Sequence, residues 1–264
     1  MDTLQNNEKI AQLLAQLTQN GQKEQAANIR QLCGYVDSLE KQYAAVLTEL
    51  QGIKEQLSEA TVQRRPFRVQ ISDAVQTAET ALKQARDQLP ALKEDLAFWA
   101  ETTANDIRRM GISALDSAMS FLGIRQILEN IQNALESAVQ SIQSAISQVE
   151  TVGKELREAG SHLTNAGRAT MGKEIQPKAV SQEGRVQTGV LAPMRGTNAM
   201  LTGMSRTADA AVASIDRLER TAEQNRGKRE RTSVRQKLEQ KKEIVSQAPP
   251  TSPQLGKRKS EVVL

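Results

Sequence analysis

The stretch that decides the fold is residues 29–57, IRQLCGYVDSLEKQYAAVLTELQGIKEQL. Its apolar residues recur at alternating spacings of three and four, a heptad pattern that predicts a helix packed along one side against other helices. Most residues between them are Gln, Glu, Lys, Ser or Ala, which suit solvated sides. We call such an apolar stripe a seam, and the first seam consists of Ile29, Leu32, Val36, Leu39, Tyr43, Val46, Leu50, Ile53 and Leu57.

Two further seams follow along the chain. The second runs from Ile71 to Thr103 and keeps its phase through Pro90, which predicts a single kinked helix rather than two separate ones. The third is clear from residue 128 to residue 149, and its solvated side is mainly Ser and Gln. The helix–helix contacts predicted from these two seams centre on Leu82, Leu89, Leu96, Leu135, Ile142 and Val149.

Breaks between the seams divide the chain into segments. Asn20-Gly21, Arg65-Pro66 and Gly111 are typical helix ends or breaks. The predicted order is a short N-terminal helix within 1–20, three long helices at 22–63, 67–110 and 113–167, a glycine-containing linker at 168–193, a helix at 194–224 and a basic, largely disordered tail at 225–264. Within this tail, a lone helix over 226–242 is an alternative, and disorder is expected from composition at 248–253 and 256–260.

The expected fold class is all-α: long heptad helices in an elongated antiparallel bundle or coiled coil, followed by a disordered basic tail. Similar helix lengths joined by short breaks favour antiparallel neighbours. Extended rods that dimerise in parallel are the main alternative. Only six of the 264 residues are aromatic, so the chain is suited to thin helix–helix seams rather than a thick core.

Glycine occupies heptad positions in two later stretches. Gly153, Gly160 and Gly167 follow one another at intervals of seven, and Gly189, Gly196 and Gly203 repeat that interval. In a helix this spacing would leave a bare groove that lets another backbone approach closely. Each glycine inside a helix also costs about 1 kcal/mol relative to alanine, so a flexible segment is the other interpretation.

The sequence offers no complete catalytic or metal-binding motif. Residues 167–173 match the spacing of a phosphate-binding loop, but Glu174 stands where a hydroxyl must hold magnesium, and no strand precedes the loop. A single histidine, His162, cannot build a metal site alone. A single cysteine, Cys33, excludes an internal disulfide and any cysteine-based metal cluster. We therefore expect no enzyme activity, no cofactor and no bound metal.

Positive charge is concentrated near the end of the chain. The whole chain carries a formal net charge of +4, whereas residues 226–242 hold eight basic and two acidic residues, so the remainder is slightly acidic. Such a run can neutralise phosphates without reading sequence, although it contains no aromatic residue for base stacking. A solvated tail that keeps the protein soluble is the alternative. The possible nucleic-acid contacts are Arg226, Lys228, Arg229, Arg231, Arg235, Lys237, Lys241 and Lys242.

Membrane association is the other surface role that the sequence permits. The segment 113–149 pairs an apolar stripe with a polar side that carries few charges, which also suits a lipid or granule surface. Burial of the same stripe in a bundle is the simpler interpretation. Peripheral membrane binding is not favoured, because Val234 and Leu238 are few apolar residues for insertion. No secretory signal or membrane-spanning run is visible, so we expect a cytoplasmic protein.

Two features of the sequence carry a resemblance. They follow a helical N-terminus rich in Gln and Leu, and they are Pro66-Phe67 leading into long heptads, and the tail Thr232-Ser233-Val234-Arg235-Gln236-Lys237-Leu238 followed by lysines. The chain resembles uncharacterised helical proteins encoded on conjugative elements of Gram-positive gut bacteria. This resemblance brings no known activity and implies a bacterial, cytoplasmic setting on a mobile element.

Taken together, these patterns predict a non-enzymatic scaffold or accessory protein that acts by helix–helix assembly. Its partners would be a second copy or another helical protein, with nucleic acid or a partner contacted by the basic tail. An amphipathic-helix protein that coats a lipid or granule surface is the alternative function.

Overall fold

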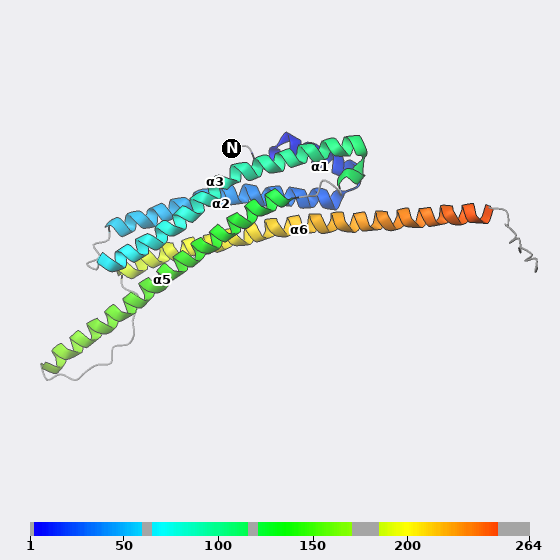
Figure 1. The fold of residues 1–264 in the computed structure, drawn as a ribbon. Helices are drawn as coiled ribbons and strands as arrows, with labels where there is room; N and C mark the ends of the chain where they lie inside the picture. The colour runs from blue at the N-terminus through cyan, green and yellow to red at the C-terminus, as the bar shows by residue number, and fades with distance from the viewer. Residues whose placement is uncertain (1–2, 60–64, 116–120, 171–184, 248–264) are drawn as a thin grey trace, which may run out of the picture.

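The computed structural model describes residues 3–59, 65–115, 121–170 and 185–247. Every long element in these residues is an α-helix, and Figure 1 shows them as an elongated bundle. The α-helices are α1 (Glu8–Gln19), α2 (Lys23–Glu59), α3 (Arg65–Met110), α5 (Leu122–Thr170) and α6 (Arg185–Gln247), with short 3-10 turns η1 (Leu4–Asn6) and η2 (Ile112–Ala114).

Four helices form the bundle in a ring. Helix α2 packs against α3 and α6, and α5 packs against the same two helices from the other side. Two ion pairs show that α2 and α3 run antiparallel. Lys54 of α2 pairs with Glu79 of α3, and Glu40, earlier in α2, pairs with Lys93, later in α3. The predicted all-α antiparallel bundle is therefore confirmed, and α6 completes it between α2 and α5.

The apolar seams of the four helices meet in the core. Every seam position named above is buried, with exposed fractions of 5% or less. Leucine, isoleucine, valine and alanine fill most of this core, and the rings of Trp99 and Phe121 pack with centroids 4.6 Å apart where α5 begins. The small aromatic content is sufficient because each helix needs to cover only a narrow stripe of its neighbours.

Helix α1 lies outside the ring, against α2 and α3. Alanines 97, 100 and 104 of α3 are buried, as are Ile10, Leu13 and Leu17 of α1. The segment before α1 is held by Asp37 of α2, whose carboxylate accepts hydrogen bonds from the backbone N–H of Leu4 at 2.9 Å and of Gln5 at 3.3 Å. A buried carboxylate thus satisfies backbone donors that would otherwise lie unpaired in the packed interface.

Two helix boundaries differ from the sequence-based expectation. Helix α5 begins at Leu122 rather than Ser113, because Gly111 at φ +77° turns the chain and the Ser113 hydroxyl donates to the Met110 carbonyl instead of capping a helix. Helix α6 begins at Arg185 and passes through Pro193. Burial of Leu191 and Met194 on either side of the proline offsets its missing hydrogen bond.

The predicted tail also differs in extent. Helix α6 continues to Gln247, so a large part of residues 225–264 is helical. The expected disordered end at 248–264 lies outside the described residues, as does most of the expected linker, 171–184.

Replacing Leu39 and Leu50 with Asp should lower the melting temperature sharply, because both side chains are fully buried and an unpaired buried carboxylate costs several kcal/mol. Circular dichroism during heating measures the effect. The control places Asp at Ala45 and Gln56, which are exposed on the same helix, and should melt close to the unmodified protein. Equal melting of both variants would contradict burial of the first seam.

Candidate nucleic-acid interface

The basic run lies on a part of α6 that extends beyond the rest of the bundle (Figure 1). Ala222 is the last buried residue of α6, and no described residue after it is buried. We call residues 223–247 the α6 arm. At 1.5 Å per residue it is about 37 Å long, enough to reach an extended partner without moving the bundle.

The predicted contact residues are exposed wherever their side chains are described. Lys228 and Arg229 lie in the helix of the arm, but their side chains are outside the described set. The exposed basic side chains are Arg226, Arg231, Arg235, Lys237, Lys241 and Lys242. The arm therefore presents a dense row of cations to solvent.

Helical geometry sorts these side chains into two rows. At about 100° per residue, Arg231, Arg235 and Lys242 fall on one side of the helix, while Lys237 and Lys241 fall on another. Two exposed apolar residues, Val234 and Leu238, lie between the rows, and each is 55% exposed. A straight helix can place only one row at a time against a rigid duplex, so about three or four phosphates can be contacted together.

Charges within the bundle are arranged differently, because they pair across helices. Arg125 of α5 donates to Asp216 and Glu219 of α6, both at 2.6 Å, and these partners raise the pKa of its guanidinium. Lys54 and Lys83 bond to Glu79 and lower the pKa of its carboxyl group. These bundle charges serve helix packing, whereas the arm holds its charges away from the bundle.

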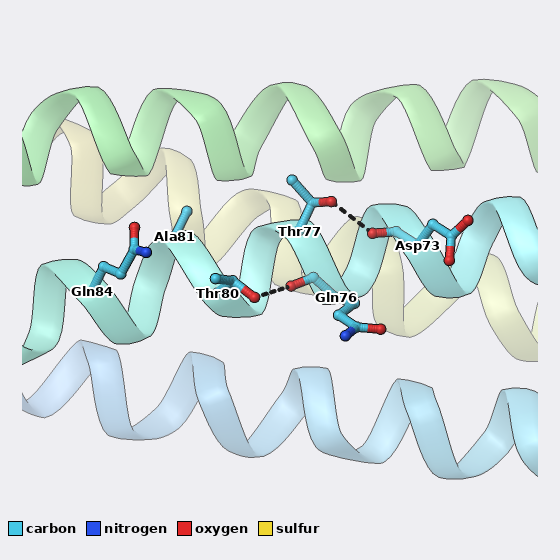
Figure 2. Close-up of a pocket in the computed structure, with 6 residues that line it drawn as sticks. All are labelled: Asp73, Gln76, Thr77, Thr80, Ala81 and Gln84. Atoms are coloured by element: carbon cyan, nitrogen blue, oxygen red, sulfur yellow. Dashed lines mark hydrogen bonds between the residues drawn. The ribbon is translucent and has the colours of Figure 1, made fainter.

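A shallow hollow lies on the outer side of α3, between α2 and α5 (Figure 2). Its lining comes from α3 alone, and the hydroxyls of Thr77 and Thr80 donate to the backbone carbonyls of Asp73 and Gln76. Asp73 is its single ionisable group. The hollow therefore offers neither a nucleophile paired with a base nor two carboxylates facing each other. Its lining residues are Asp73, Gln76, Thr77, Thr80, Ala81 and Gln84.

The histidine, the cysteine and the phosphate-loop match of the sequence do not form a common site in the described residues. His162 is exposed on α5, and Cys33 is buried on α2. Within the described ranges, no group of three or more His, Cys, Asp or Glu side chains could hold a metal ion. Residues 167–170 of the phosphate-loop match are the last turn of α5, and the rest of the match lies outside the described residues.

The glycine positions are helical and bare. Gly160 lies on α5, and Gly189, Gly196 and Gly203 lie on α6. At each of these four, an added Cβ atom would meet no other atom within 4 Å. None of the described helices fills the space beside these four glycines.

In comparison with known proteins, residues 6–260 match a family of unknown function, DUF6674. The chain belongs to this family. No curated protein and no solved structure matches it. The family match spans the bundle helices and the whole α6 arm, so the arm belongs to the same family unit as the bundle. Among the described helices, none has an apolar segment long enough to cross a membrane.

Sequence reasoning found the arm from its charge, but it missed the ion pairs that align α5 with α6. The partners of Arg125 lie 91 and 94 residues further along the chain. No local spacing marks such a pair. The available signal was the acidic side of α6 at Asp216 and Glu219, which becomes informative only when α6 is known to lie against α5.

Cys33 should resist thiol reagents in the native protein. Burial, with a smaller contribution from the charge of Asp37, raises the pKa of its thiol to about 12, so at about pH 8 roughly one thiol in ten thousand is ionised. Ellman's reagent should react slowly with the native protein and rapidly in guanidinium. A Thr164→Cys variant, exposed on α5, should react at once through its added thiol. Rapid reaction of native Cys33 would contradict its burial.

Proposed function

We propose that this protein is a non-enzymatic helical scaffold or accessory protein whose α6 arm contacts nucleic acid through its phosphates. The observation that carries the proposal is the separation of roles along α6. Up to Ala222 the seam of α6 is buried in the bundle, and beyond it the described basic side chains are exposed on a projecting helix. The α6 arm is thus a charged helix whose position is fixed by the folded bundle.

The chemistry of the arm favours a polyanion bound without sequence preference. Lysine and arginine side chains pair with phosphates and release condensed counterions, which supplies affinity that depends on salt. Base readout needs a helix with groove-reading side chains or aromatic residues for stacking. No aromatic residue occurs in the arm, so contacts to the sugar–phosphate backbone are the expected mode.

The cellular setting belongs to the same proposal. The tail sequence from Thr232 to Leu238 resembles those of proteins carried on conjugative elements, which are DNA molecules that move between bacteria. A cytoplasmic accessory protein that holds such DNA near a helical assembly fits this setting. A partner protein with an acidic surface is the other polyanion that the arm could meet.

Fluorescence anisotropy with a random duplex tests the proposal. Binding should weaken steeply with salt, with a slope of log K against log salt of about −3 to −4 for three to four contacts. A variant with Arg231, Arg235 and Lys242 changed to Gln should lose most of the affinity. The matched control changes Lys41, Arg109 and Arg206, three exposed basic residues of the bundle, and should bind nearly as the unmodified protein does.

Two results would overturn the nucleic-acid proposal. The first is no binding at low salt, where the electrostatic contribution is greatest. The second is an equal loss of affinity in both triple variants, which have the same net charge. That result would mean that overall charge rather than the α6 arm attracts the DNA.

An anionic lipid surface is a second candidate, favoured by one observation. Val234 and Leu238 are each 55% exposed between rows of basic residues, an arrangement that suits shallow insertion. The apolar stripe of α5 that suggested lipid coating is buried in the bundle. If the arm binds lipid, the protein should float with anionic liposomes, and changing Val234 and Leu238 to Ser should abolish flotation while leaving DNA binding intact. Failure to float would exclude this candidate.

A further inference from the structure

Helix α5 extends beyond the bundle at the end opposite to the α6 arm (Figure 1). Val149 is its last buried residue, and after it no described residue of α5 is buried. Just after it, Glu150 of α5 forms an ion pair with Arg195 of α6 at 2.6 Å. We call residues 152–170 the α5 overhang.

The sequence of the overhang continues the seam of the bundle. Inside the bundle the seam of α5 includes Ile142, Ala145 and Val149, exposed by 3% or less. The same spacing of three and four continues without interruption into the α5 overhang, which extends past the other described helices (Figure 1). The residues at these seam positions in the overhang are Val152, Leu156, Ala159, Leu163 and Ala166.

The α6 arm provides an internal comparison. The seam of α6 is apolar up to Leu218 and Ala222, both buried. Beyond the bundle the same spacing falls on polar or charged residues, as expected of a helix surrounded by water. These residues are Asn225, Arg229, Thr232, Gln236 and Glu239. One helix therefore loses its seam on leaving the bundle, whereas the other keeps it.

We infer that the α5 overhang is a self-association surface on which two copies of the chain pair in an antiparallel, two-fold arrangement. The inference rests on the assembly part of the proposed function and names the segment that carries it. A seam kept apolar outside the bundle requires a second apolar surface to cover it. A second copy supplies one with the same spacing and length.

The position of the seam dictates the direction of the pair. Within the bundle the seam of α5 faces α3 and α6, so a helix seated on the overhang seam lies in line with those two helices. A parallel partner would have to continue into the space that they occupy. An antiparallel partner instead ends where the bundle begins, and its own bundle lies at the far end of the pair.

An antiparallel pair centred near Ser161 also gives good packing. The sequence then places Leu156 opposite Ala166 of the other copy, and Ala159 opposite Leu163, so that each large residue meets a small one. Gly160 meets its own counterpart along one edge. Because an added Cβ at Gly160 would meet nothing within 4 Å, the two backbones can approach closely there.

The two projecting segments differ in net charge. The α5 overhang holds three basic residues and two acidic ones, so two copies scarcely repel each other. The α6 arm holds eight basic and four acidic residues, which disfavours pairing of two arms. The α5 overhang therefore suits a second copy, and the α6 arm suits a polyanion.

Pairing through α5 would set the two arms at opposite ends of the assembly. Each α6 arm points away from the α5 overhang of its own chain (Figure 1), so the arms of a two-fold pair point outward. Two arms on one particle can engage two separated stretches of one polyanion, and such linked binding raises the overall affinity without any new contact.

Sedimentation velocity on the full-length protein tests the pairing. The 29.0 kDa chain should form a dimer of about twice that mass. The overhang is only about 28 Å long, a short pairing surface, so dimerisation should require micromolar concentrations. An Ala159→Glu variant should be monomeric with unchanged melting. The matched control, Thr164→Glu, adds the same charge to an exposed position off the seam and should remain dimeric.

Energy transfer between dyes at residue 240 tests the direction. An antiparallel pair holds the two arms at opposite ends and should show no transfer, whereas a parallel pair would bring the arms together. A protein that stays monomeric at several hundred micromolar, a dimer that survives Ala159→Glu, or strong transfer would each overturn the inference. DNA binding by the monomeric Ala159→Glu variant is measured separately and needs only one α6 arm. If pairing fails, the proposed function is therefore not contradicted.

Discussion

Burial of one narrow apolar stripe on each helix is the constraint on which the rest of the molecule depends. A helix in a ring of four can cover its stripe only if it has a neighbour on each side, and α2, α3, α5 and α6 satisfy this condition mutually. Each buried leucine contributes on the order of 2 kcal/mol relative to an exposed one. The seams together supply the main favourable contribution to folding, and no helix is stable in its place without the others.

Polar contacts orient this bundle more than they stabilise it. Exposed ion pairs such as Lys9 with Glu101 contribute about 0–1 kcal/mol. The alignment of Arg125 with two acidic residues of α6, and of Arg195 with Glu150, fixes how far α6 slides along α5. This alignment decides where each helix leaves the bundle. The lengths of the α5 overhang and the α6 arm follow from it.

Heptad spacing was sufficient to predict the helical class and the buried residues, because the periodicity of Ile29–Leu57 has no other physical solution than a packed helix. The end of α3 at Gly111 was also readable from glycine. The start of α5 could not be predicted in this way, because the Ser113 hydroxyl donates to the preceding Met110 carbonyl and does not cap a following helix. Neither could the course of α6 through Pro193, since tertiary burial of Leu191 and Met194 outweighs a local helix breaker.

The candidate interface was predictable in composition but not in form. Counting charges located the basic run, yet a run of lysines and arginines reads equally well as a disordered tail. That the arm is the direct continuation of a bundle helix depends on α6 being anchored through Leu201 to Ala222 by α2 and α5. Such anchorage arises from segments far away in the sequence: α2 lies more than a hundred residues before Leu201, and Arg125 of α5 lies 91 residues before Asp216. No local pattern contains this information.

The ring order of the helices has a consequence for how the chain is made. Helix α2 is the first bundle helix to leave the ribosome, and its neighbour α6 is the last. Until α6 is synthesised, the hairpin of α2 and α3 must carry an uncovered apolar side, and a nascent chain in that state is vulnerable to aggregation. Helix α1, which needs only α2 and α3, can dock early through Asp37. The segment from α1 to α3 can therefore assemble while the remainder is still being translated, and closure of the ring waits for the synthesis of α6.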